Sequence, residues 1–168
     1  MISDLLHCAL VAISSNRSQG SWVAGSSVVA KFIGREPNDI DIHHVSIGAY
    51  EEAVDKDISS LVEVGFSSVA RRQTNTELDV TFSNAGSTLS MNWVLESTPP
   101  VAIIEDPLLG MRASFADVIA RKIEMYTKDP QSKHRDDLLA LLRRSTELAR
   151  ELDPTKFTND LRKIGIIE

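Results

Sequence analysis

The alternation of apolar and polar positions predicts the strands of this chain. Residues 39–45 alternate strictly, and Ile40 and Ile42 are the apolar members, which is the two-residue period of a half-buried strand. Three further segments have strand-like composition and are separated by turn residues that are typical of hairpins. These segments are residues 66–72, 77–82 and 88–95, and a short buried strand is expected before them at 22–25.

A spacing of three to four residues between apolar positions predicts the helices. They are expected at residues 3–15, 28–33, 49–64, 114–128, 132–152 and 154–163. Pro130 and Pro154 separate the last three, because proline ends a helix or occupies its first turn. This order of elements predicts an α/β (α+β) fold with two domains, an α/β core over residues 1–105 and a C-terminal helical region over 106–168.

The composition narrows the class of protein. Of the 168 residues, 42% are hydrophobic and 25% are charged, which is ordinary for a globular protein and excludes disordered and collagen-like classes. The longest apolar runs, such as residues 8–13, are far shorter than the roughly 20 residues of a membrane span, so no membrane association is expected. A single cysteine, Cys8, fits a reducing cytoplasm. The net charge of −6 argues against tight nonspecific binding to nucleic acid.

Two aspartates on the alternating strand are the first candidate for chemistry. Asp39 and Asp41 are two residues apart, so their side chains are expected on one face of the strand. Two carboxylates about 4 Å apart repel by about 4 kcal/mol at an effective dielectric near 20, and a divalent cation would relieve that repulsion. Carboxylates and water are the ligands that Mg²⁺ and Mn²⁺ prefer. The alternative is a pair of aspartates that simply face solvent.

A small turn before these aspartates is the second candidate. Gly25, Ser26 and Ser27 lie between a predicted strand and a predicted helix, where free backbone N–H groups can meet a phosphate. Glycine also lets the backbone approach a ligand closely. An ordinary turn with a helix cap is the alternative. Together with the two aspartates, this turn favours a site for a nucleoside triphosphate and a metal ion.

These motifs resemble a known superfamily. The Gly25-Ser26 turn, a helix and then Asp39-Ile40-Asp41 resemble the signature of the DNA polymerase β-like nucleotidyltransferases. Within that superfamily the chain is similar to the AbiEii/AbiGii toxin-type nucleotidyltransferases. The closer resemblance rests on Lys122 in Ala-Arg-Lys-Ile-Glu and on Arg135 in Arg-Asp-Asp-Leu, and the whole covers residues 20–145.

The resemblance implies a small mixed sheet flanked by helices and followed by a C-terminal helical bundle. It also implies transfer of a nucleotidyl group from an NTP, with Mg²⁺ or Mn²⁺, to an acceptor such as tRNA or a protein, and a role as the toxin of a toxin–antitoxin pair with an antitoxin partner. Asp39 and Asp41 would hold the metal. Gly25, Ser26, Ser27, Lys122 and Arg135 would bind the nucleotide; alternatively, Arg135 forms an ion pair with Asp136.

The superfamily resemblance further implies a third carboxylate that binds metal and acts as the base. Asp79 is the candidate, but the strand around Asn92 also resembles the segment that carries this residue. If Asn92 occupies the position, the chain is expected to be a degenerate member that binds nucleotide or a protein partner without transfer. A plain interaction module, whose helical half docks a partner, is the third hypothesis.

Overall fold

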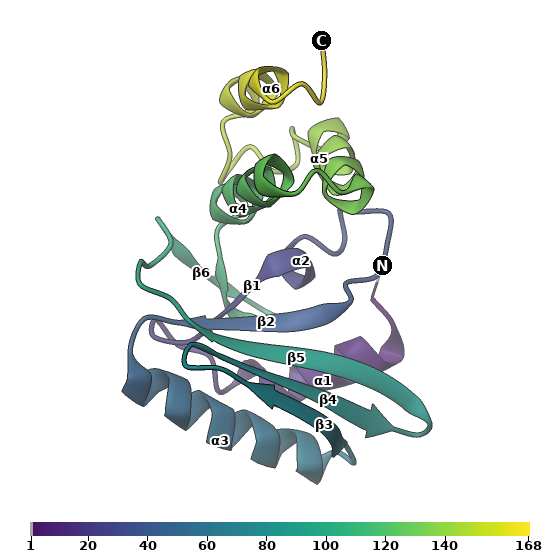
Figure 1. Cartoon of the computed structure of the whole chain (residues 1–168), viewed down its shortest axis with the longest axis vertical. Helices are drawn as coiled ribbons and strands as arrows, with labels where there is room; N and C mark the ends of the chain where they lie inside the picture. Colours follow the sequence, from purple (N-terminus) through teal and green to yellow (C-terminus); the bar gives the residue numbers. More distant parts are fainter. Residues whose placement is uncertain (1) are drawn as a thin grey trace.

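Seven strands form one mixed sheet in the computed structural model, which describes residues 2–168 (Figure 1). The strands are β1 (Trp22–Ala24), β2 (Asp39–His44), β3 (Ser67–Gln73), β4 (Glu77–Asn84), β5 (Ser87–Leu95), β6 (Ile103–Asp106) and β7 (Gly110–Ala113). Their order across the sheet is β3-β4-β5-β2-β1-β7-β6. β2 runs parallel to β5 and β1 runs parallel to β7, whereas the other neighbours are antiparallel. The expected α/β class and mixed sheet are confirmed.

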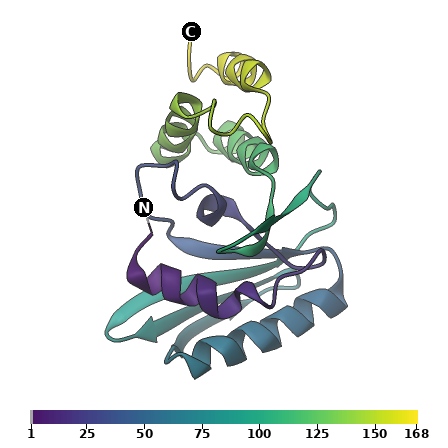
Figure 2. The ribbon, with the colours of Figure 1, turned by 180° about the vertical axis from the view of Figure 1, so that it is seen from behind.

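Six helices cover the two faces of this sheet. They are α1 (Asp4–Ser14), α2 (Gly25–Val28), α3 (Ile47–Glu63), α4 (Phe115–Lys128), α5 (Ser132–Arg143) and α6 (Pro154–Lys163). α1 and α3 lie against one face, and α2 with the C-terminal helices lies on the other (Figures 1 and 2). Within residues 2–168, no helix has the length and apolar character needed to cross a membrane.

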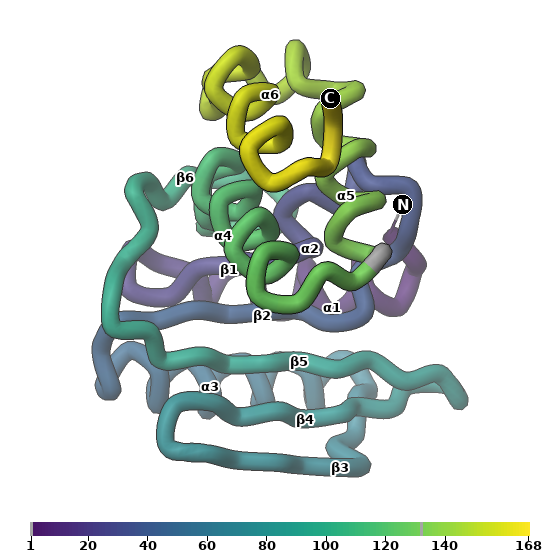
Figure 3. The backbone as a smooth tube through the Cα atoms, turned by 45° about the horizontal axis from the view of Figure 1, so that its top comes forward, coloured from purple at the N-terminus to yellow at the C-terminus, as the bar shows by residue number. Residues whose placement is uncertain are grey.

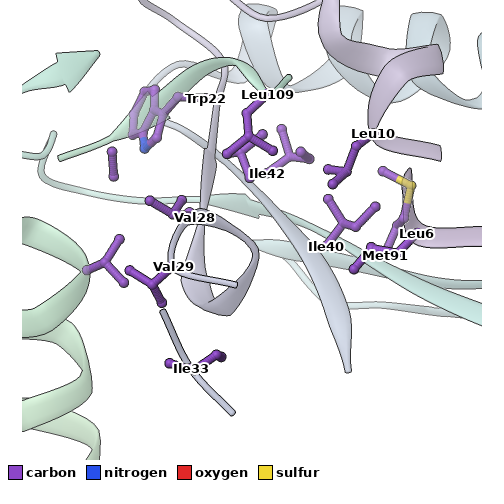
Figure 4. Packing of buried hydrophobic residues seen from close by; sticks show 14 of the residues in the cluster. Leu6, Leu10, Trp22, Val28, Val29, Ile33, Ile40, Ile42, Met91 and Leu109 are labelled. Atoms are coloured by element: carbon purple, nitrogen blue, oxygen red, sulfur yellow. The ribbon is translucent and has the colours of Figure 1, made fainter. Parts of the chain in front are cut away.

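The alternation of β2 gives the sheet a buried face and a polar face. Ile40 and Ile42 are fully buried, whereas Asp39 and Asp41 are only half-buried. Ile40 packs near Leu6 of α1 and Met91 of β5 (Figure 4). Burial of each such side chain contributes about 1.5–3 kcal/mol. This packing fixes the register of β2, because a shift by one residue would turn both aspartates into the core.

A buried polar network connects α3 to β5 on the face of the sheet that α1 and α3 cover. The Asp57 carboxylate of α3 accepts hydrogen bonds from the Arg17 guanidinium and from Trp93 Nε1 of β5, the latter at 2.8 Å. The side chains of Arg17 and Asp57 are both fully buried. Removing one partner of a buried ion pair leaves an uncompensated charge, so this network holds α3 and β5 in a defined arrangement.

Two expected helices have different bounds in the structure. The helix expected at residues 28–33 begins at Gly25 and ends at Val28, so the Gly-Ser turn is itself the first turn of α2. The helix expected at 132–152 ends at Arg143, and residues 144–151 form turns closed by backbone hydrogen bonds. Glu151, at the end of those turns, accepts hydrogen bonds from Arg112 and from the Phe115 backbone. This contact turns the segment back onto β7.

The hairpin of β6 and β7 was not expected. The sequence predicts no strand after residue 95, yet β7 pairs with β1 through Val23 and Arg112 and so extends the sheet to residue 113. The hairpin therefore crosses the expected boundary between residues 105 and 106. The division of the chain into two domains stays a prediction.

Candidate functional site

The two aspartates of β2 face the helices of the polar side. The strand places Asp39 and Asp41 on that face, as the alternation predicts, and α2 begins beside them. Gly25 has a φ of +64°, and a Cβ at this position would overlap the Asp41 carboxylate. Glycine is therefore required here both for its conformation and for the close approach. The turn and the carboxylate pair form one site.

Negative charge accumulates at this site. Burial, and then the charge of Asp39, raise the pKa of Asp41 to about 6. The pKa of Asp39 is also raised, first by burial and then by the charge of Asp79. A bound cation would favour the ionised form of both groups.

The register of the sheet gives the positions of Asn92 and Asp79, the two candidates for the third metal ligand, relative to Asp41. Asn92 of β5 pairs directly with Asp41, and Asp79 of β4 pairs with Asn92 on its other side. Asp79 is therefore two strands away from Asp41, and its carboxylate accepts a hydrogen bond from Arg72 at 3.1 Å. Asn92 of β5 is therefore the residue beside Asp41, whereas Asp79 lies one strand further away and its charge still acts on Asp39; Asp79 as the third carboxylate stays a prediction.

The oxygen atoms around Asp41 fit a hard divalent cation. Asp39 and Asp41 supply two carboxylates, and the Asn92 side chain is hydrogen-bonded to the Asp41 carboxylate, while its buried Oδ1 has no hydrogen-bond partner among residues 2–168. Carboxylate and amide oxygens are ligands of Mg²⁺ and Mn²⁺. No group of three or more His, Cys, Asp or Glu side chains in the described part of the chain is arranged to hold a metal ion. The donor set is thus two carboxylates and one amide oxygen.

A second group of side chains lies at the turn, and we call it the Ser26 cluster (Ser26, Arg35, Lys122 and Asp137). Lys122 Nζ of α4 donates to Ser26 Oγ at 2.9 Å and to Asp137 Oδ2 of α5 at 2.7 Å. Arg35, in the loop before β2, donates to both carboxylate oxygens of Asp137, at 2.9 and 2.7 Å, and to Ser26 Oγ at 3.2 Å. Lys122 therefore reaches the Gly-Ser turn, and its role in nucleotide binding stays a prediction.

The charges of the Ser26 cluster compensate one another. Burial lowers the pKa of Lys122, while the hydrogen bond and charge of Asp137 act in the opposite direction. Burial of Asp137 opposes its ionisation, but hydrogen bonds from Arg35 and Lys122 outweigh burial and lower its pKa. Two cations share one carboxylate, so the cluster carries a net positive charge beside the acidic pair.

Two further residues expected to bind nucleotide, Ser27 and Arg135, differ in their surroundings, and their roles stay predictions. Ser27 is buried, and its hydroxyl donates to the Asp39 backbone carbonyl at 3.1 Å, which ties α2 to β2. Arg135 is exposed on α5, as is Asp136. Of the Arg-Asp-Asp-Leu motif it is Asp137 that enters the site. The sequence reasoning missed both Arg35 and Asp137 as site residues, because 102 positions separate them and no local pattern links them.

The site is open on one side. α4 and α5 lie over α2 and β1, whereas no helix lies in front of β3, β4 and β5 (Figure 3). The side chains on that face of β4 and β5 are polar and half-buried, among them Thr81 and Ser90. Two surface pockets have volumes of about 400 and 380 Å³. The first lies at Ser60 of α3, and the second is lined by α1, the start of β5 and residues 36–38 of the loop that leads to Asp39.

Comparison with known proteins supports the fold. No family model matches the chain, and no curated protein matches it either. Similar solved structures include JHP933 from Helicobacter pylori, which is 15% identical with a TM-score of 0.51 over 98% of this chain and 91% of that chain. They also include an H. pylori protein provisionally named a nucleotidyltransferase, which is 16% identical with a TM-score of 0.51 over 99% of this chain and 85% of that one. The chain therefore has a nucleotidyltransferase-like fold, and its place in the AbiEii/AbiGii subgroup stays a prediction.

Proposed function

We propose that this protein is a metal-dependent nucleotidyltransferase that moves a nucleotidyl group from an NTP to a hydroxyl-bearing acceptor. The observation that carries the proposal is the contact between the Gly25-Ser26 turn and the Asp39–Asp41 pair. A phosphate-binding turn and a metal-binding pair must lie together to act on one triphosphate, and in this fold they are adjacent. The positive Ser26 cluster completes the attraction for phosphate.

The proposed roles follow from position. Asp39, Asp41 and Asn92 Oδ1 would hold Mg²⁺ or Mn²⁺, which would polarise the α-phosphate and lower the pKa of the attacking hydroxyl. The Ser26 hydroxyl and the start of α2 would hold the outer phosphates, and Lys122 would offset their charge from behind Ser26. Asp79 lies at the open side, where the acceptor would enter.

The acceptor and the biological role are inferences from the family resemblance. We propose tRNA or a protein as the acceptor, and a toxin role with an antitoxin partner. The overall charge of −6 fits a protein acceptor as well as RNA, because an RNA-binding surface would have to be local.

A second function is favoured by one observation. Asn92 lies next to Asp41 on the neighbouring strand, and if this is the position of the superfamily's third carboxylate, the amide there cannot accept a proton from the attacking hydroxyl. A protein with this replacement could bind Mg²⁺ and NTP without transferring the nucleotide.

Label transfer separates the two functions. The protein is incubated with Mg²⁺ and each α-³²P-NTP, together with total tRNA or cell protein, and the acceptors are resolved on gels. Label on an acceptor, lost in Asp41→Asn but kept in the surface control Asp55→Asn, supports transfer. NTP binding without label supports the degenerate binder. Absence of both binding and transfer contradicts both proposals.

A further inference from the structure

The two cations of the Ser26 cluster differ in accessibility. The side chain of Lys122 is 7% exposed, whereas that of Arg35 is 30% exposed. Lys122 lies behind Ser26, and its ammonium group is already bonded to Ser26 Oγ and to the Asp137 carboxylate. A ligand phosphate that approaches from solvent meets Arg35 without disturbing the packing of α4 on α5, and cannot meet Lys122 in this way.

The guanidinium of Arg35 is held along one edge. Its Nε and Nη2 groups donate to the two oxygens of Asp137 at 2.9 and 2.7 Å, a bidentate pair that fixes the plane of the group. Its remaining bonds, from Nη2 to Ser26 Oγ and from Nη1 to the Glu36 carbonyl, are longer, at 3.2 Å each. The second edge is therefore the one that can exchange its partners for phosphate oxygens.

The loop that carries Arg35 also leads into the acidic pair. Arg35 is four residues before Asp39, and its positive charge acts to lower the pKa of that carboxylate. The loop thus places a planar cation between the phosphate-binding turn and the first proposed metal ligand. Arginine in a rigid fork is well suited to bind phosphate oxygens.

We propose that Arg35 is the residue that directly contacts the terminal phosphates of a nucleoside triphosphate at this site. The inference rests on the proposed function, and it assigns the contact to a residue in the loop before β2 rather than to the lysine of α4. It also makes the site selective for nucleotides with a full triphosphate, because a monophosphate whose α-phosphate lies at the metal pair has no outer phosphates for the guanidinium to contact.

Calorimetry on the full chain tests this assignment. Binding of the α,β-methylene analogues of ATP, GTP, CTP and UTP is measured with Mg²⁺ for the wild type, Arg35→Gln, Arg35→Lys and the control Arg143→Gln, which changes an exposed arginine at the end of α5. Loss of a charge-assisted hydrogen bond is expected to weaken binding about 10- to 100-fold in Arg35→Gln. Arg35→Lys should bind with intermediate affinity, since it keeps the charge and loses the fork. Arg143→Gln should bind as the wild type does.

The contrary outcomes are distinct. Thermal unfolding without nucleotide shows whether each variant is folded, and inorganic triphosphate serves as a second probe that lacks the nucleoside. If the wild type binds an analogue and folded Arg35→Gln binds it equally well, the assignment to Arg35 is wrong and the proposed function stands. If the wild type binds none of the four analogues, the proposed function is wrong and the assignment fails with it.

Discussion

Asp41 is the residue at which burial, charge and backbone geometry meet. It lies against Gly25, pairs across the sheet with Asn92, and shares one face of β2 with Asp39. Its raised pKa, about 6, means that the ionised carboxylate lowers the free energy of unfolding of the metal-free protein. Functional sites commonly contain such groups, since the ligand supplies the missing charge.

The pH dependence of the free energy of unfolding should show this destabilising effect of ionised Asp41. With a pKa of about 6 in the folded state and about 3.9 when unfolded, the folded protein binds the Asp41 proton more tightly. The contribution of Asp41 to the free energy of unfolding therefore falls as pH rises from about 4 to about 6. We expect metal-free Asp41→Asn to be more stable than the wild type at pH 7.5, by on the order of 1–3 kcal/mol, and the difference to vanish near pH 4. Urea unfolding measures it, and a difference that does not change with pH would contradict the account.

A substitution of Gly25 tests the close contact between the Gly25-Ser26 turn and Asp41. Gly25→Ala places a Cβ on the Asp41 carboxylate and an L side chain at a φ of +64°. Strain at such a position costs on the order of 1–3 kcal/mol, and the overlap adds to it. Gly48→Ala is the matched control, because Gly48 lies in the first turn of α3 and a Cβ there meets open space. Equal melting temperatures for the two variants would show that the turn does not press against Asp41.

At the scale of elements, the site depends on the hydrogen bonds of the Ser26 cluster, which connect α2, α4 and α5. Ser26 lies in the first turn of α2, Lys122 lies on α4 and Asp137 lies on α5, so their hydrogen bonds connect α2 with two helices that are distant from it in sequence. Asp137 is 2% exposed and compensates two cations. The C-terminal helices are thereby fixed against the Gly25-Ser26 turn.

Variants of two neighbouring aspartates on α5, Asp137 and Asp136, test whether the Ser26 cluster connects these helices. Asp137→Ala leaves Lys122 buried without its carboxylate, and breaking a buried pair costs about 3–5 kcal/mol. Asp136→Ala changes an exposed residue one position away and should stay within about 0.5 kcal/mol of the wild type. Chemical denaturation compares the two. Similar small losses in both variants would mean that the Ser26 cluster does not join the helices.

The elements that could be predicted from sequence are those with local patterns. Strict alternation identified β2 and its two aspartates, and turn residues separated β3, β4 and β5. β7 has four residues and pairs in parallel with a distant strand, so it has no local signal. The end of α5 at Arg143 carries neither proline nor glycine, and the contact of Glu151 with Arg112 decides it. The position of Asn92 beside Asp41 follows from strand order, which no local pattern contains.

At the scale of the whole molecule, the layers leave one half of the sheet open beside the site. The C-terminal helices cover α2 and β1, whereas no helix lies in front of β3, β4 and β5 (Figure 3). The structural neighbours share this fold at 15–16% identity. A triphosphate between the Ser26 cluster and the aspartates would therefore point its α-phosphate toward the open half, where an acceptor hydroxyl can reach it.

Thermal unfolding with Mg²⁺ and NTP tests the central claim most directly, which is that Asp39 and Asp41 hold a cation beside the phosphates of a bound nucleotide. A ligand at 100 times its dissociation constant adds about 2.7 kcal/mol of stability, which raises the melting temperature of a chain of this size by several degrees. We predict this rise for the wild type with Mg²⁺ and at least one NTP together, and its loss in the double variant Asp39→Asn/Asp41→Asn. No rise with any of the four NTPs, or an equal rise in the double variant, would contradict the account.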